Sequence, residues 1–260
     1  MLPCNRVSKE GFNIFHILKN FGAFIVYAMH AFRTIVTFQF KAKHVVNQVV
    51  YLGINSIPIV VLTSLFIGMA FSVQVVKELL RFGAPDLVGG VVAMAIWREL
   101  GPLLTSIVIA GRVGASITAE IGAMKVNEQI DALNVMGQDS MQYLVAPRII
   151  ALALILPLLV GLADIVGFFG GLIIAVSTSL INYVSFFTSA NTMLSSFDIL
   201  SGIMKAFIFS FVISLNATYL GLYVKYGAHD VGRKTQKSVV ISIVIIFGLN
   251  YLMSVLFFGS

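Results

Sequence analysis

The residues that could do chemistry in this chain centre on Arg98 and Glu99, an adjacent charged pair inside the apolar run 87–111. Burying one such charge at the centre of a bilayer costs about 2.5–3.5 kcal/mol. Adjacent residues of a helix point about 100° apart, so the two side chains need not pair with each other. Two interpretations carry equal weight. The pair lines a polar cavity or holds a substrate headgroup, or each charge is neutralised by a neighbouring helix or a second copy of the chain.

Gly101 and Pro102 follow the charged pair and favour a local break in the helix. Proline has no backbone N–H, so it removes one helical hydrogen bond and leaves a carbonyl free. We therefore expect Arg98, Glu99, Gly101 and Pro102 to form an irregular polar segment at membrane depth.

A polar connector, residues 112–148, separates this run from the next apolar one. Its polar and apolar residues alternate as in an amphipathic helix, which predicts a surface that docks on a cytoplasmic partner. Glu128 and Asp131 are three residues apart and share one face, suited to a basic groove. A helix resting on the bilayer is the disfavoured alternative, because anionic lipid would repel this acidic face. The candidate docking residues are Glu120, Lys125, Glu128, Gln129 and Asp131.

Small residues recur at a spacing of four, which lets helix backbones approach closely. One series is Gly111, Ala115, Ala119 and Ala123, and Gly167 with Gly171 forms a second pair. Packing within one chain is the favoured interpretation. The expected packing residues are Gly111, Gly114, Ala115, Gly167 and Gly171.

Other chemistry is sparse. Asp164, Lys205 and Glu120 are isolated charges near apolar sequence, expected to be structural partners, with Asp164 the better functional candidate. The sequence lacks a phosphate-binding loop, a nucleophile elbow and a zinc-protease motif, and no nucleophile–base pair for an intramembrane enzyme can be assembled. Cys4 is the only cysteine, and no metal-ligand spacing relates the four histidines, so no metal site is predicted. We expect a protein that is not an enzyme and takes its energy from a partner or an ion gradient.

The composition places these residues in a polytopic membrane protein. Of 260 residues, 58% are hydrophobic and 11% charged, against about 25% charged in soluble domains. The net charge of +6 comes mostly from lysines and arginines before residue 45 or within 225–237, the pattern of cytoplasmic flanks. Nucleic-acid binding is therefore not expected.

We predict an all-α fold with an N-terminal interfacial amphipathic helix, five transmembrane helices and a cytoplasmic helix between spans. Residues 1–44 form the interfacial segment and residues 45–260 the transmembrane domain. The alternative for residues 20–32 is a true span, but this uncharged stretch is shorter than the roughly 20 residues that a span needs. The N-terminus is expected inside and the C-terminus outside. The expected spans are 45–76, 87–111, 149–176, 201–224 and 238–260, with a short helix allowed in the outside loop 177–200.

Two stretches resemble a known family. They are residues 98–137, RELGPLLTSIVIAGRVGASITAEIGAMKVNEQIDALNVMG, and residues 143–151, YLVAPRIIA. They closely resemble the MlaE/YrbE permeases, subunits of ABC transporters that maintain outer-membrane lipid asymmetry, with a counterpart in chloroplast lipid import. The resemblance is specific over residues 95–151 and extends more weakly to the C-terminus. Gln138-Asp139-Ser140 departs from the Asp-Pro that usually follows Met-Gly in that family.

The resemblance implies a homodimeric permease in a bacterial inner membrane or plastid inner envelope, with phospholipid as its cargo. It implies two cytoplasmic ATPase subunits that bind ATP–Mg, a periplasmic ring of MCE-domain proteins and room for a small STAS-domain protein. Residues 119–133 would be the coupling helix that seats in the ATPase. Arg98, Glu99, Gly101 and Pro102 would lie at a lipid cavity between protomers. The rival function is an ion-coupled secondary carrier that uses Glu99, Asp164 and Lys205 as a relay.

Overall fold

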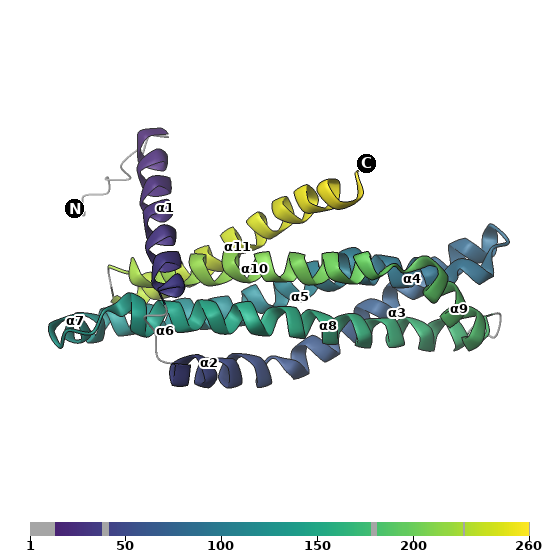
Figure 1. Cartoon of the computed structure of the whole chain (residues 1–260), viewed down its shortest axis with the longest axis horizontal. Helices are drawn as coiled ribbons and strands as arrows, with labels where there is room; N and C mark the ends of the chain where they lie inside the picture. The colour runs from purple at the N-terminus through teal and green to yellow at the C-terminus, as the bar shows by residue number, and fades with distance from the viewer. Residues whose placement is uncertain (1–13, 38–41, 178–180, 226, 260) are drawn as a thin grey trace, which may run out of the picture.

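The structure is a computed structural model that describes residues 14–37, 42–177, 181–225 and 227–259. All regular structure in these ranges is helical (Figure 1). The elements in chain order are α1 (Ile14–Val36), α2 (Ala42–Ile54), α3 (Ile57–Arg81), η1 (Pro85–Leu87), α4 (Val88–Ala95), η2 (Ile96–Leu100), α5 (Gly101–Ile109), η3 (Ala110–Gly114), α6 (Ala115–Val126), α7 (Gln129–Val135), η4 (Met141–Val145), α8 (Ala146–Ser177), α9 (Tyr183–Met193), α10 (Ser196–Leu222) and α11 (Gly227–Phe258).

Five of the described helical stretches are long and apolar enough to cross a membrane. This finding confirms the predicted all-α polytopic membrane fold. The stretches are Ile57–Arg81, Pro85–Val126, Met141–Ser177, Ser196–Leu222 and Gly227–Phe258.

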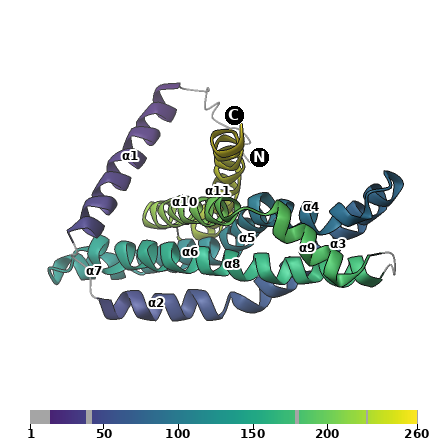
Figure 2. The same cartoon turned by 45° about the vertical axis from the view of Figure 1, so that its right-hand side comes forward.

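The first apolar run is divided into a lead-in helix, α2, and a span, α3. The division falls at Asn55 and Ser56, and Pro58 occupies the first turn of α3, where its missing N–H costs no helical hydrogen bond. Helix α2 runs alongside α8 in both views (Figures 1 and 2), with Gly53 packed on Ile155.

The second span extends further than the sequence indicated. Its helical run continues from Pro85 to Val126, through η2 and η3, which are π-helical turns. The expected end at Gly111 is therefore wrong. The helix continues through Glu120, whose carboxylate is neutralised by Arg148 of α8 at an N–O distance of 3.2 Å.

The connections after α8 and after α10 are also largely helical in the structure. The loop after α8 contains the short helix α9, as the sequence allowed. The basic segment 225–237 was expected to be a connector, but α11 begins at Gly227 and includes most of it.

The bundle core lies between the second span, α8 and α10, around Ile109, Leu152, Leu156, Phe209 and Ile213. Helices α3 and α8 approach closely at a second contact. A Cβ atom on Gly68 would overlap the backbone of Gly167, and Ser72 Oγ donates a 2.8 Å hydrogen bond to the Gly171 carbonyl.

Helix α1 crosses the bundle at a steep angle and packs on it over a short contact (Figures 1 and 2). Tyr27 and Ala31 are buried against Val145 and Ile149, whereas its other apolar residues, such as Phe32, are largely exposed. This arrangement favours the interfacial helix over a true span, and α1 is not among the five candidate spans. The N-terminal 13 residues lie outside the described part, and a division at residue 44 stays a prediction.

Candidate functional site

The site is built on η2, the π-helical turn that carries Arg98 and Glu99 within the second span. Gly101 N–H reaches back to the Ile96 carbonyl, one residue further than in an α-helix. Pro102 has no N–H to offer the Arg98 carbonyl, as the sequence indicated. Lys205 Nζ supplies the missing donor, at 2.8 Å from that oxygen. The irregular turn is therefore closed by a side chain from α10.

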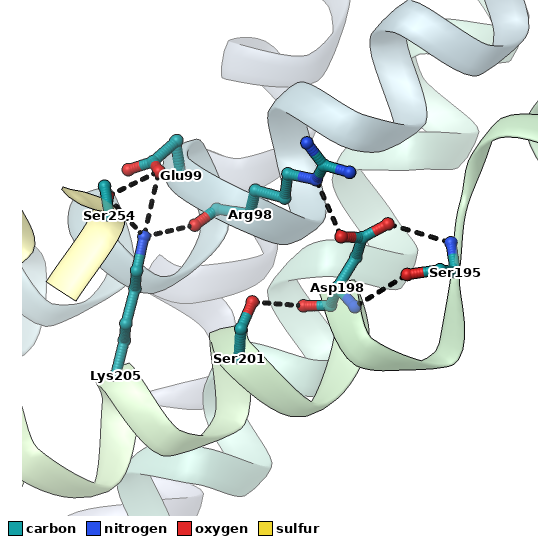
Figure 3. A network of polar contacts seen from close by, with 7 residues as sticks. All are labelled: Arg98, Glu99, Ser195, Asp198, Ser201, Lys205 and Ser254. Atoms are coloured by element: carbon teal, nitrogen blue, oxygen red, sulfur yellow. Dashed lines mark hydrogen bonds and ion pairs between the residues drawn. The ribbon is translucent and has the colours of Figure 1, made fainter. Parts of the chain in front are cut away.

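Glu99 points into a polar network that joins three spans (Figure 3). Its Oε1 lies 2.9 Å from Lys205 Nζ and accepts a 2.7 Å hydrogen bond from Ser254 Oγ. Its Oε2 accepts a 2.8 Å hydrogen bond from Asn250 Nδ2. Lys205 is fully buried, whereas the Glu99 side chain is 37% exposed. The carboxylate thus neutralises a buried ammonium and still reaches the surface of the chain.

Arg98 points to the other side, as expected for adjacent helical residues. Its Nε lies 2.7 Å from Asp198 Oδ1, and its guanidinium lies 4.4 Å from the centre of the Phe258 ring. Asp198 also accepts from Ser195 N–H at 2.8 Å, and the Ser195 hydroxyl accepts from Asp198 N–H, so the pair forms a capping box for α10. Asp198 therefore both caps the first turn of α10 and binds Arg98.

The four charges form two separate ion pairs, Arg98–Asp198 and Lys205–Glu99. In each pair one partner is buried and the other, from η2, is about one-third exposed. Neutralisation by neighbouring helices is thus present within a single chain. The exposed part of each η2 side chain remains able to meet a ligand.

Gly101 and Pro102 have packing roles in this chain. The Asp164 carboxylate lies against Gly101, where a Cβ atom would overlap it, and Pro102 packs on Gly202. A cavity of about 20 Å³ beside Gly101 has room for a water molecule but not for a lipid.

Asp164 is separate from the network. It is buried, and its Oδ1 has no hydrogen-bond partner in the described residues. None of the hydrogen bonds found among those residues links it to Glu99 or Lys205. The structure therefore brings two members of the supposed ion relay together and leaves the third apart.

The docking residues lie on two helices rather than on one. Helix α6 ends at Val126, and Glu128 has a positive φ of 58° that turns the chain into α7. Lys125 bridges the turn to Asp131, with an N–O distance of 2.8 Å. Glu128 and Gln129 are exposed, whereas Glu120 is engaged by Arg148 and by the Ser116 hydroxyl at 2.8 Å.

The predicted packing residues fall into two groups, those at contacts between helices and those at or near the surface. Gly167 and Gly171 lie at the close α3–α8 contact, and Gly114 faces Ile213. Gly111 is exposed, with no atom near the position of its missing Cβ, and Ala115 is half-buried. The expectation that Gly111 packs within the chain is therefore wrong.

Sequence reasoning missed Asn250 and Ser254 and gave no role to Asp198. The first two lie four residues apart and so share one face of an otherwise apolar helix. That pattern could have marked them. The pairing of Asp198 with Arg98 has no comparable signal, because the two are far apart in the chain.

Comparisons with known proteins give one family. The family model described as "Permease MlaE" matches residues 45–256. A probable ABC transporter permease protein of Rickettsia bellii is 37% identical over 254 residues, which covers 98% of each chain.

Two further relatives carry names that mention lipid or a plastid. The intermembrane phospholipid transport system permease protein MlaE of Haemophilus influenzae is 33% identical over 83% of each chain. The chloroplastic protein TRIGALACTOSYLDIACYLGLYCEROL 1 of Arabidopsis thaliana is 38% identical over 83% of this chain and 62% of that protein.

Proposed function

The chain belongs to the MlaE permease family, and from this premise we propose that it is the membrane subunit of an ABC transporter that moves phospholipids between inner and outer membranes. A separate cytoplasmic ATPase, with ATP–Mg bound, supplies the energy. A periplasmic MCE-domain protein exchanges lipid with it, and a small STAS-domain protein is a further candidate partner. The subunit lies in an inner membrane, or in a plastid inner envelope, with its N-terminus cytoplasmic and its C-terminus periplasmic.

The observation that carries this proposal is that the two terminal nitrogens of the Arg98 guanidinium are left without a hydrogen-bond acceptor among the described residues. Its Nε binds Asp198 (Figure 3), and no hydrogen bond from either terminal nitrogen is found among the described residues. Two terminal N–H groups of a guanidinium match the spacing of two phosphate oxygens. The ion pair with Asp198 orients the group, so a phosphate headgroup would meet a positioned donor.

We place a cavity large enough for lipid between two copies of the chain. The cavity beside Gly101 holds no more than water, so the lipid site proposed at η2 lies between protomers. Gly111 and Ala123 are exposed and belong to one series of small residues, a surface that suits close packing of a second helix.

The exposed turn between α6 and α7 is the proposed ATPase contact. Glu128, Gln129 and Asp131 supply acceptors there, and the Lys125–Asp131 pair holds the turn. The second span is continuous from this turn to η2, so movement of the turn would be transmitted along one helical run to the lipid site.

Reconstitution in vesicles tests the proposal. The permease and its ATPase are inserted into vesicles that contain a fluorescent phospholipid, and movement of that lipid is followed with and without ATP. We expect movement that requires ATP and is lost when the ATPase cannot hydrolyse it. Movement driven by an ion gradient without nucleotide would instead establish the secondary carrier.

A further inference from the structure

A second arginine, Arg112, lies deep in the same span. At a rise of about 1.5 Å per residue, it is about 21 Å along the helical run from Arg98. Arg112 lies beside α2, at the level where Gly53 packs on Ile155 of α8. Helix α1 packs on Val145, at the end of η4, and Ile155 is about 15 Å further along the same helical run. If α1 marks the cytoplasmic interface, Arg112 is well inside the membrane.

No carboxylate pairs with Arg112 in the described part of the chain. Its NH1 donates to the Ser56 hydroxyl at the break between α2 and α3, and no other hydrogen bond is formed by its guanidinium there. The other arginines of this span and of α8 differ, since Arg98 binds Asp198 and Arg148 binds Glu120. An arginine at this depth is costly without a negative partner, so a ligand or another molecule must supply the charge.

Arg112 borders a hollow that is open for such a ligand. The hollow has a volume of about 80 Å³ between α2 and the second span. Tyr51 forms part of its wall and also borders a larger hollow of about 380 Å³, together with Asn47 and Asn55. No acidic residue lines either hollow. Tyr51 thus shares a hollow with Arg112, and Asn47 and Asn55 border the adjoining one, so side chains with O–H or N–H donors for an anion line both hollows.

We propose that Arg112, with Tyr51 and Asn55, binds the phosphate of a phospholipid headgroup in the cytoplasmic half of the membrane. The site is separate from Arg98, and it rests on the proposed function in taking phospholipid as the cargo. The α3 surface beyond Ser56 suits the acyl chains, because Leu62 and Phe66 are exposed apolar residues there. A headgroup bound at this depth has left the interface, so the site is an early position on the transport route.

Photocrosslinking in vesicles tests the site. The photoreactive residue p-benzoylphenylalanine replaces Val50, which is 50% exposed and borders the larger hollow, in protein reconstituted in phosphatidylethanolamine and phosphatidylglycerol. After illumination, intact mass counts the lipids attached per chain. We expect phospholipid adducts that fall at least about tenfold in Arg112→Gln, as the loss of a charge-assisted hydrogen bond predicts. Arg112→Lys should retain adducts, since it keeps the positive charge.

Matched controls separate the contribution of the lipid phosphate from that of the acyl chains. Arg233→Gln removes an exposed arginine elsewhere and should leave the adducts unchanged. Diacylglycerol with the same acyl chains should attach equally in the parent and in Arg112→Gln, because it has no phosphate. Asn55→Leu provides a second loss variant if Arg112→Gln does not insert, and it should also lower the phospholipid adducts.

Three outcomes would overturn the inference. Adducts could be insensitive to both Arg112→Gln and Asn55→Leu. The crosslink could join two copies of the chain and disappear in Arg112→Gln, which would make Arg112 a contact between protomers. Glycerophosphate without chains could displace the lipid fully, which would indicate a site for a soluble phosphate. The crosslink needs no nucleotide, so loss of ATP-driven transport with an intact Arg112-dependent crosslink would refute the proposed function alone.

Discussion

Pro102 and Lys205 meet at one carbonyl oxygen: proline leaves the Arg98 carbonyl without a helical donor, and Lys205 Nζ donates to it at 2.8 Å. The same ammonium lies 2.9 Å from Glu99. A single buried side chain thus repairs the backbone and neutralises the carboxylate. Because Lys205 comes from α10 and Glu99 from η2, the stability of the bundle and the geometry of the proposed lipid site depend on one contact.

The Lys205–Glu99 pair should behave as a unit in stability measurements. Glu99→Gln leaves a buried ammonium without its counter-charge. Breaking a fully buried pair costs about 3–5 kcal/mol, and the loss here should lie below that range because solvent screens the 37% exposed Glu99 side chain. Glu99→Gln with Lys205→Met should recover much of that loss. Denaturant unfolding in detergent of both single variants and the double variant measures the coupling. Additive effects of the two substitutions would contradict the expectation.

The capping box at α10 can be separated from the ion pair. Ser195→Ala removes the hydroxyl that accepts from Asp198 N–H, which should cost about 1 kcal/mol. Asp198→Ala removes the cap and the counter-charge of Arg98 together, so its effect should be larger. Hydrogen exchange of the first turn of α10 reports the cap. Equal protection in the two variants would show that Arg98 adds nothing to this helix end.

The close contact between α3 and α8 requires glycine at position 68. Gly68→Ala places a Cβ atom in the backbone of Gly167, so the helices must separate and thermal stability should fall. Gly161→Ala is the matched control, because it lies in α8 with no neighbour near the added atom. There the better helix propensity of alanine should be neutral or stabilising by up to about 1 kcal/mol. Similar melting temperatures for the two variants would be inconsistent with this contact.

Glu128 should be needed for assembly with the ATPase. Glu128→Lys reverses a charge on the exposed turn, and we expect the ATPase to be lost on co-purification while the permease still inserts. Asn tolerates a positive φ, so Glu128→Asn removes the charge with little backbone strain and should give an intermediate yield. Glu78→Lys, at an exposed position in the last turn of the first span, serves as the control. A normal yield of complex with Glu128→Lys would remove the turn from the proposed contact.

The proposed orientation can be read with single cysteines in a Cys4→Ser background. Glu128→Cys lies on the turn assigned to the cytoplasm, and Asp86→Cys lies in η1, assigned to the periplasm. In intact cells a membrane-impermeant maleimide should label Asp86→Cys and spare Glu128→Cys. After lysis both positions should react. The reverse pattern in intact cells would invert the topology.

Much of the architecture follows from the sequence because its signals are local. Apolar runs long enough to cross a bilayer identify the five spans, and Gly101-Pro102 indicates the irregular turn that contains Arg98 and Glu99. Both depend on neighbouring residues alone. The resemblance over residues 95–151 indicated the family for the same reason, since it is carried by two stretches that lie close together in the sequence.

Tertiary structure decided the partners and the exact lengths of the helices. Lys205 pairs with Glu99, and Asp198 with Arg98, across 106 and 100 residues of sequence, and both pairings depend on how α10 packs against the second span. The second span extends beyond Gly111 to Val126, and Arg148 on α8 neutralises Glu120 within that extension. Local sequence determines which segments enter the membrane as helices. Packing between distant helices determines which of their charges are neutralised there and which, like that of Arg112, remain available.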